Sequence, residues 1–283
     1  MTHFRPIELN DKPWMDACRD VRRNPFSSLS FPCLYAWKNT YGFSITGDED
    51  FFVVYSQHDR AYYCPCGKQE KCMAFIEQTC REEKKPHFLY LTREQGEHLK
   101  QCGFHLILRD DLSEYISSSS ALALTEGHHM SNSFKMKVRH FQRDVPYTVC
   151  PLTEAELPFL RDLARIAEAE SRGIMGDWNV LETELESFHA LGMWGIGLET
   201  ADGRRAFLLG YENTAEEFTM TMTKHAPSLP IQVTAVLVHE MACRLKDKYA
   251  LINLEEDLGL SGLRRAKMLY SPVDRLNVYE AIR

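Results

Sequence analysis

Hydrophobic and polar positions follow the more regular pattern in the second half of the chain. Three apolar runs are separated there by turn residues: Trp194–Leu198, Ala206–Tyr211 and Glu217–Met222. The turn pairs Asp202-Gly203 and Asn213-Thr214 predict an antiparallel meander. Apolar residues then recur about every four positions from Pro230 to Tyr249, which predicts a long helix. Residues 250–253 are expected to form one further strand.

The first half mixes short strand patterns with helical ones. Apolar runs bounded by turn residues predict five strands, at residues 42–45, 51–55, 61–64, 88–91 and 104–108. Helical spacing predicts helices at 12–23 and 69–83. Thr92 with Gln95 forms a capping box, which starts another helix. Residues 31–37 are apolar and aromatic, which fits either a helix or a buried loop.

Two segments near the middle have conflicting signals. Residues 134–141 alternate between apolar and polar, which predicts a strand. Residues 154–170 are expected to be a helix, opened by Thr153 with Glu156 as its capping-box partner. Pro158 lies awkwardly late for that start, so the first turn is expected later. The serine run at 117–120 marks a connector, and we place a domain boundary between about 120 and 145.

Composition limits the classes of protein. The chain has 283 residues, 44% of them hydrophobic, which suffices for one large or two ordinary cores. A net charge of −7 argues against a general nucleic-acid coat. No stretch of eighteen apolar residues and no apolar leader is present, so we expect a soluble, cytoplasmic protein without a transmembrane segment.

Motifs for metal and hydrolase chemistry are missing. Nine cysteines without a signal peptide are expected to be free thiols. Cys64, Cys66 and Cys72 resemble half of a zinc site, but a second ligand pair is absent, and we expect no metal. G-x-S-x-G, H-E-x-x-H and G-x-x-x-x-G-K are absent.

The last forty residues concentrate the polar chemistry. Three consecutive acids, residues 255–257, follow an apolar strand, and like charges this close repel one another. Arg264, Arg265 and Lys267 lie shortly after a glycine turn and can compensate them. Such an arrangement is typical either of a polar site at a strand end or of a surface salt-bridge network.

The stretch Asn253–Pro272 resembles the motif N-x-E-E-D-L-G-x-x-G-L-R-x-A-K-x-x-Y-x-P. That motif closes the C-terminal catalytic domain of the phosphatidylglycerol lysyltransferases and their uncharacterised relatives. Weaker similarities occur at 64–68, 109–116 and 223–226. The resemblance implies two tandem acetyltransferase-like (GNAT) domains of α/β (α+β) class, with mixed, largely antiparallel sheets flanked by helices. We expect them at 1–130 and 131–283, with the site in the second domain and a helix at 134–141.

The resemblance also implies transfer of an acyl or aminoacyl group, in the lysyltransferases from aminoacyl-tRNA. Glu255 and Asp257 would share one side of a strand, with Glu256 on the other. These acids can take the proton of an attacking amine or bind the α-amino group of an aminoacyl donor. Tyr270 can protonate the leaving oxygen or pack its ring. The predicted catalytic residues are therefore Glu255, Asp257 and Tyr270.

Five residues are predicted to bind substrate: Asn253, Glu256, Arg264, Lys267 and Lys224. Arg264 and Lys267 share a helix face, where they can clamp a phosphate or the acceptor end of tRNA. Arg265 is expected to point into solvent. By resemblance Lys224 faces the same cleft, whereas a lone lysine after a strand is more often solvated.

The chain departs from the family at two cationic positions. Ser131–Phe134 stands where the family has a basic K-K-R-N motif, and Leu254 replaces an arginine, which indicates a changed donor or acceptor. The remaining anion-binding candidates are Lys135, Lys137, Arg139, His140 and Arg143. The loop 226–230 has no glycine, and its prolines remove N–H donors, which argues against acetyl-CoA.

We therefore expect an acyl or aminoacyl transferase acting on an amine or hydroxyl, with a small molecule or lipid head group as acceptor and aminoacyl-tRNA as one candidate donor. The alternatives are a CoA-dependent N-acetyltransferase and a non-catalytic binding protein that keeps the fold. Donor, acceptor and oligomeric state are left open by the sequence.

Overall fold

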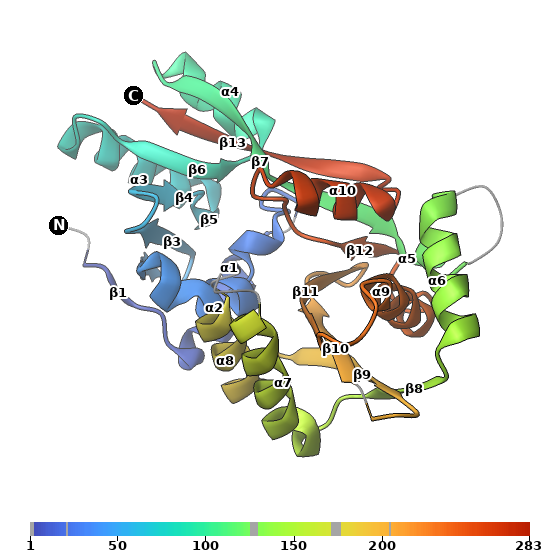
Figure 1. Cartoon of the computed structure of the whole chain (residues 1–283). Coiled ribbons are helices and arrows are strands. Elements are labelled where there is room, and N and C mark those ends of the chain that lie inside the picture. The colour runs from blue at the N-terminus through green and yellow to red at the C-terminus, as the bar shows by residue number, and fades with distance from the viewer. Residues whose placement is uncertain (1–2, 21, 125–129, 171–176, 204) are drawn as a thin grey trace. The chain divides into compact units, whose positions relative to one another are not determined.

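The computed structural model describes residues 3–20, 22–124, 130–170, 177–203 and 205–283 (Figure 1). By its contacts the chain divides into two compact units, Met1–Glu114 with Leu276–Arg283, and Tyr115–Arg275. Strands β7 (His105–Ser118) and β13 (Asp274–Ile282) each contribute residues to both units. The expected boundary at residue 130 therefore falls inside the second unit, and the last strand returns to the first.

The first unit contains a mixed sheet with helices. Its strands are β1 (Arg5–Pro6), β2 (Phe43–Asp48), β3 (Phe51–Ser56), β4 (Ala61–Tyr63), β5 (Cys66–Gly67) and β6 (His87–Leu91). Its helices are α1 (Lys12–Cys18), α2 (Phe31–Tyr41), α3 (Gln69–Glu82) and α4 (Arg93–Gln101). The β4–β6 pair is parallel, and the pairs β1–β2, β2–β3, β3–β4, β3–β5 and β6–β13 are antiparallel.

Local signals account for most elements of this unit. Residues 31–37 belong to helix α2, because Ser30 caps it, Pro32 lies in its first turn and left-handed Gly42 ends it. The capping box of Thr92 and Gln95 is present at the start of α4. The predicted helix at 12–23 ends early, at Cys18, and the predicted strand at 104–108 is only the beginning of the longer β7.

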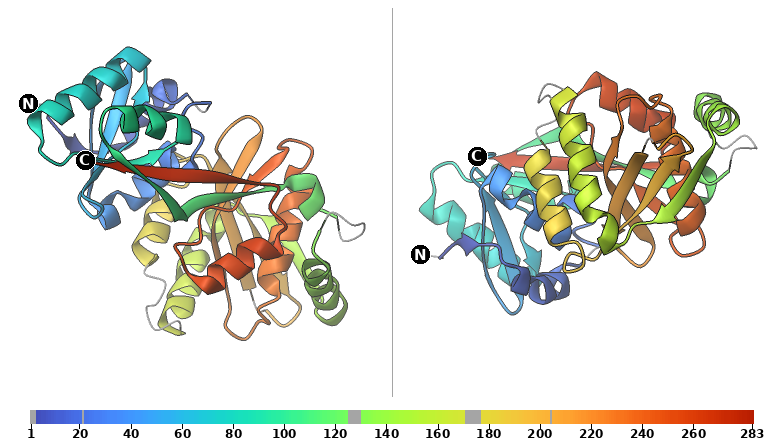
Figure 2. Two further views of the ribbon diagram at one scale, coloured as in Figure 1. Left: turned by 90° about the horizontal axis from the view of Figure 1, so that it is seen from above. Right: turned by 60° about the horizontal axis from the view of Figure 1, so that its bottom comes forward.

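The second unit has a sheet with helices on both faces (Figure 2). Its further strands are β8 (Tyr147–Pro151), β9 (Met193–Thr200), β10 (Arg205–Glu212), β11 (Glu217–His225) and β12 (Leu251–Asn253). Its helices are α5 (Ser119–Leu122), α6 (Asn132–Asp144), α7 (Leu157–Glu170), α8 (Trp178–Glu186), α9 (Val233–Leu245) and α10 (Ser261–Leu269). Strands β8 to β11 are antiparallel, β11–β12 is parallel and β12–β7 is antiparallel.

Helices α6 and α9 share one hydrophobic core with this sheet. Val236 and Met241 of α9 pack there with Phe218 and Met220 of β11 and with Phe134 of α6. Helix α7 contacts β10 and β11, and Figure 2 shows α7 and α8 on the face opposite α9. The sheet therefore has an apolar α9 face and a second face covered by α7 and α8.

Two conflicting sequence signals are resolved in this unit. Residues 134–141 are helical, because Ser131 caps α6 and Phe134, Val138 and Phe141 bury one face at helical spacing. The alternating pattern was therefore misleading, and the expectation of a helix is correct. The predicted helix at 154–170 begins as a short 3-10 turn at Glu154–Glu156, so that α7 starts later and Pro158 lies in its first turn.

Strand β11 has two irregularities that position the candidate site. It pairs with β12 only from Glu217 to Thr219, after which the two strands separate at the level of Thr219 and Asn253. Further along, Thr221 and Met222 both lie opposite a single β10 residue, Leu209, as a β-bulge. A bulge adds one residue to the alternation, so side chains after it change face.

Among the described residues, no helix is long and apolar enough to cross a membrane. The same residues contain no group of three His, Cys, Asp or Glu side chains placed to hold a metal ion. Cys64 and Cys66 are buried, and burial raises the pKa of the Cys64 thiol to about 12. A thiol with that pKa stays protonated at neutral pH and does not act as a nucleophile.

Candidate functional site

The three consecutive acids do not continue strand β12, which ends at Asn253. Glu255 has a left-handed backbone with φ of +60°, and Leu258 and Gly259 follow with φ of +51° and +70°. The left-handed turn breaks the alternation of a strand, so the expectation that Glu255 and Asp257 share one side is wrong. Asp257 is fully buried, whereas Glu255 and Glu256 are both half-buried. We call residues 254–257 the acid segment.

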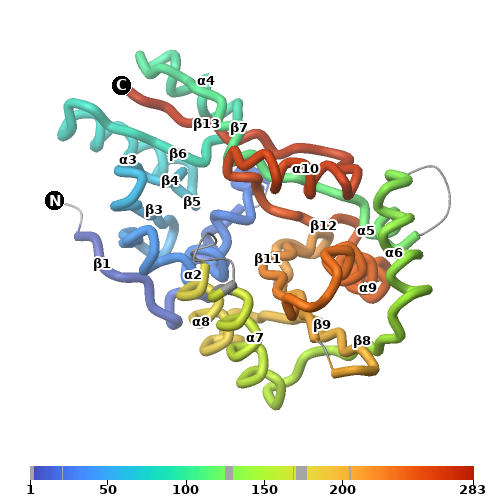
Figure 3. The backbone as a smooth tube through the Cα atoms, in the orientation of Figure 1, coloured from blue at the N-terminus to red at the C-terminus, as the bar shows by residue number. Residues whose placement is uncertain are grey.

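Backbone contacts hold the acid segment in place. The Asn253 Oδ1 accepts the Glu255 N–H at 2.8 Å, and its Nδ2 donates to Glu217 Oε1 at 3.2 Å. The Lys267 Nζ donates to the Leu254 carbonyl, and β7 exchanges backbone hydrogen bonds with the segment through Tyr115. Asn253 and Lys267 therefore act on the backbone of the segment, which Figure 3 traces from β12 into α10.

Asp257 is the buried anchor of the segment. Its carboxylate accepts from the Tyr115 hydroxyl at 2.6 Å, the Arg264 Nε at 2.7 Å and the Gly259 N–H at 2.8 Å. Burial opposes its ionisation, but the hydrogen bonds from Arg264 and Tyr115 outweigh this effect, and the pKa of Asp257 is lowered. A carboxylate held by this many donors is a poor proton acceptor, so its geometry favours a positioning role.

Tyr270 lies just after α10 and is buried. Its ring meets the Phe134 ring edge-on, with 5.7 Å between centroids, and its carbonyl accepts the Ser117 hydroxyl at 3.2 Å. Burial raises the pKa of the Tyr270 phenol well above its usual value. The phenol therefore stays protonated and can serve only as a donor; its proposed contact with a leaving oxygen remains a prediction.

A lone lysine after a strand is expected to be solvated, but Lys224 is buried. It is 6% exposed, and its Nζ donates to both Asp177 carboxylate oxygens at 2.8 Å. The β11 bulge explains this position, since it returns Lys224 to the face that already carries Glu217 and Thr219. We call these residues, together with Thr221, the polar row of β11: Glu217, Thr219, Thr221 and Lys224.

Glu184 of α8 lies beside this pair and was missed from the sequence. It is buried, and desolvation raises the pKa of its carboxyl to about 8, opposed by a hydrogen bond from Thr221. A readable signal was present, because Glu184 shares the buried face of α8 with Val180, Leu181 and Leu185. A carboxylate on an otherwise apolar helix face is seldom buried without a reason. Asp177, also missed, had no comparable signal.

The polar row joins the two groups of residues singled out in the sequence. At one end Glu217 holds Asn253, which in turn fixes Glu255. At the other end Lys224 meets Asp177 and Glu184. Both groups therefore belong to one face of the second unit, although they are separated by about thirty residues in the sequence.

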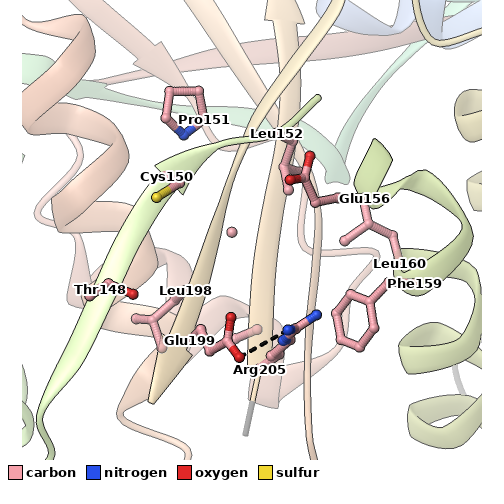
Figure 4. A pocket seen from close by; sticks show the side chains of 12 residues that line it. Thr148, Cys150, Pro151, Leu152, Glu156, Phe159, Leu160, Leu198, Glu199 and Arg205 are labelled. Carbon is pink, nitrogen blue, oxygen red and sulfur yellow. Dashed lines mark hydrogen bonds and ion pairs between the residues drawn. The ribbon is translucent and has the colours of Figure 1, made fainter. Parts of the chain in front are cut away.

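Two pockets lie elsewhere. A pocket of about 160 Å³ lies between β8, β9, β10 and α7, where Arg205 pairs with Glu199 at 2.9 Å and covers the Phe159 ring at 4.4 Å (Figure 4). A larger one of about 1030 Å³ in the first unit is lined by Arg22, Arg23 and other residues between α3 and α4. Neither contains a residue predicted for the site.

Similarity to known proteins extends over nearly the whole chain. The model of the family "Phosphatidylglycerol lysyltransferase, C-terminal" matches residues 21–282. No curated protein matches the chain. A conserved protein of unknown function from Bacteroides thetaiotaomicron is 27% identical, with a TM-score of 0.86 over 100% of this chain and 99% of that one.

Two further solved structures are more distant. L-PGS from Bacillus licheniformis is 14% identical, with a TM-score of 0.63 over 94% of each chain. FemX is 9% identical, with a TM-score of 0.65 over 98% of this chain and 96% of that one. These likenesses concern the fold alone. They confirm the expected fold class, α/β with mixed, largely antiparallel sheets flanked by helices.

Proposed function

We propose, on the premise that this chain belongs to the family of the phosphatidylglycerol lysyltransferase C-terminal domain, that it transfers an aminoacyl group from an ester donor to an amine or hydroxyl acceptor. The family is one of aminoacyltransferase domains. The observation that carries the proposal is the left-handed backbone of Glu255, in a segment that Asn253 and Lys267 hold in place.

A left-handed conformation costs a residue other than glycine roughly 1–3 kcal/mol. Such strain persists where the surroundings enforce it, and it concentrates at binding and catalytic sites. Here the enforcing contacts come from Asn253, Lys267 and the Tyr115 backbone, and Asp257 closes the segment by holding Arg264. Residues that merely formed a surface salt-bridge network would not need a strained backbone.

The proposed role of each residue follows from its position in or beside the acid segment. Glu255 and Glu256, half-buried on the acid segment, are proposed to bind the α-ammonium group of the aminoacyl donor. Asp257 and Asn253 position them, and the half-exposed guanidinium of Arg264 is proposed to reach the phosphate of a nucleotide ester. Tyr270 is proposed as the donor to the leaving oxygen. Transfer then proceeds by attack of the acceptor on the ester carbonyl, with loss of the donor alcohol.

The loop before α9 bears on whether the donor carries coenzyme A. Pro227 and Pro230 have no N–H, Ala226 donates its N–H to the Arg205 carbonyl at 2.8 Å, and Leu229 donates to Ala226 at 2.9 Å. Backbone donors that would hold a pyrophosphate at a helix N-terminus are thus absent or already engaged at these positions. This arrangement supports an ester donor without coenzyme A.

The basic run offers limited support for tRNA. Lys135 of α6 is buried, and exposed Arg143 pairs with Asp144 at 2.6 Å. Arg139 and His140 are exposed on the same helix. A surface of this size suits contact with the acceptor end of a tRNA rather than with its whole body. We therefore propose aminoacyl-tRNA as the first donor to test and an aminoacyl ester of a smaller alcohol as the second.

The experiment measures donor consumption. Wild-type protein, Glu255→Gln and the control Glu199→Gln, an exposed acid on β9, are incubated with tRNA charged with mixed radiolabelled amino acids. We expect wild type and the control to release the label, and Glu255→Gln to be at least tenfold slower. The same assay is run with aminoacyl methyl esters. Consumption of neither donor by the wild-type protein, or equal rates for Glu255→Gln, would contradict the proposal.

A further inference from the structure

Two buried side-chain oxygens on one face of the second unit have no hydrogen-bond partner within the described part of the chain. They are Oε2 of Glu184, which is 4% exposed, and Oγ1 of Thr219, which is 0% exposed. Burying a polar atom without a partner is unfavourable, and native proteins rarely do so without a reason. An absent ligand is one such reason, provided that a single group can reach both atoms.

Both oxygens belong to neighbours of Thr221. Thr219 and Thr221 are two positions apart on the same strand, which places their side chains on one face about 7 Å apart along it. Glu184 reaches the same face from α8, where Thr221 hydrogen-bonds it. Thr219 also lies where β11 and β12 separate, so no neighbouring strand closes that end of the polar row.

The charged side chains described around Glu184 pair with one another and not with Glu184. Lys224 and Asp177 neutralise one another through two contacts of 2.8 Å. Among the residues that the structure describes, Glu184 has no cation of its own, and burial raises the pKa of its carboxyl to about 8, so at neutral pH it is mostly protonated. The groups facing it are Asp177, Lys224 and Thr221, and together they would accept one additional positive charge.

A primary ammonium group supplies both the missing hydrogen-bond donors and the missing positive charge. It has three N–H donors and one positive charge, which match the needs of a carboxylate oxygen and a hydroxyl oxygen that both lack a donor. An alcohol has one donor and no charge. A phosphate or carboxylate would be repelled by Asp177 and by Glu184 once it ionised.

We propose that the acceptor in this reaction is a primary amine, which binds as an ammonium ion at Glu184 and Thr219 and is deprotonated by Glu184. This inference rests on the proposed aminoacyl transfer and names its acceptor. One ammonium proton passes to Glu184 Oε2, and the nitrogen lone pair attacks the ester carbonyl carbon. The carbon–oxygen bond to the donor alcohol breaks as the Tyr270 hydroxyl donates its proton to that oxygen, and a second nitrogen proton replaces the one that Tyr270 gave. The products are an amide and the free alcohol, and Glu184 returns its proton to solvent.

The test measures binding of a simple amine without any donor. Pentylammonium and pentanol, matched in chain length, are titrated into the full-length protein by calorimetry at pH 7, in buffers of different ionisation enthalpy. We expect the amine to bind at least tenfold more tightly than the alcohol. Because free Glu184 is mostly protonated at this pH and the bound ammonium ion ionises it, about one proton should be released per amine bound.

Variants of α8 test whether the amine binds at Glu184. Glu184→Gln should weaken amine binding at least tenfold and abolish proton release. The matched control, Glu186→Gln, changes an exposed acid on the same helix and should leave both unchanged. The titration contains no donor, so failure of the donor assay does not affect this measurement. Equal binding of amine and alcohol, no amine binding at all, or full proton release by Glu184→Gln would overturn the inference.

Discussion

The side-chain amide oxygen of Asn253 accepts the backbone N–H of Glu255 at 2.8 Å, across the residue where strand β12 ends. Since the other end of the amide donates to Glu217, its orientation is set by β11. The left-handed turn at Glu255 is thus tied to the sheet, which fixes the position of its backbone. This relationship leads to the first prediction.

Glu255→Gln should reduce donor binding far more than stability. A glutamate that holds a substrate ammonium is close to other acids when no substrate is bound, and neutralising it relieves repulsion. We expect the free energy of unfolding to change by less than about 0.5 kcal/mol, or to rise. Urea unfolding and affinity for aminoacyl methyl esters should be measured side by side. A large loss of stability with unchanged affinity would instead make Glu255 a structural partner of the nearby cations.

Asp257→Asn should behave in the opposite way. It leaves Tyr115, Gly259 and Arg264 without their charged acceptor, and loss of one member of a buried pair costs roughly 3–5 kcal/mol. We expect a loss at the lower end of that range, about 3 kcal/mol, because Arg264 is half exposed. Asp247→Asn, at an exposed aspartate, is the control.

The same variant should change acid stability. The pKa of Asp257 is lowered in the folded protein, so its contribution is complete above the unfolded value of about 3.9 and is lost as the pH falls through the folded value. The difference in stability between wild type and Asp257→Asn should therefore be constant from pH 7 to 5 and shrink below about pH 4. A difference that stays constant down to pH 3 would show that the charge of Asp257 is not what stabilises the segment.

Glu184→Gln should make stability less dependent on pH in the neutral range. The pKa of Glu184 is raised to about 8 by burial, so the folded state binds its proton more tightly than the unfolded state does. Wild-type stability should therefore fall as the pH rises from about 4.3 to 8, by at most about 1.4 kcal/mol for each pH unit. Glutamine imitates the protonated acid, so the variant should equal wild type below about pH 4 and exceed it at pH 9. Parallel curves over this range would contradict the shifted pKa.

Two glycines of the second unit should respond differently to alanine. A Cβ at Gly210 would lie 2.2 Å from the Thr219 carbonyl oxygen and 2.4 Å from the Phe218 ring, so β10 and β11 must shift. We expect Gly210→Ala to cost roughly 1–3 kcal/mol. Gly262 of α10 has open space around it, and Gly262→Ala should add up to about 1 kcal/mol through helix propensity. Thermal unfolding measures both, and equal effects would show that the close approach at Gly210 is not limiting.

Acetyl-CoA should bind poorly. The loop from Ala226 to Pro230 has two prolines, and the N–H groups of Ala226 and Leu229 are engaged within the second unit. Titration calorimetry should show no binding with a dissociation constant near or below about 1 μM, which corresponds to about −8 kcal/mol. Binding that tight would favour a CoA-dependent N-acetyltransferase.

The sequence alone determined the kinds of most elements and pointed to the region of the candidate site. Helix starts at Ser30 and Thr92 and the meander turns are local features, because caps and turns depend on residues a few positions apart. The motif from Asn253 to Pro272 pointed to the family for the same reason, since its residues are close in the chain. Where a local pattern was short, as at 134–141, tertiary packing decided between strand and helix.

Only the tertiary structure decided which acids are buried and which side chains they contact. Asp257 is buried because Tyr115, more than a hundred residues earlier, donates to it, and no local pattern contains that contact. Lys224 meets Asp177 because a bulge in β11 changes the face on which it lies, and a bulge is set by pairing with β10. Burial and pKa depend on everything packed around a group. That is why Glu184, unremarked as one of forty acids in the sequence, becomes the proposed proton acceptor in the folded chain.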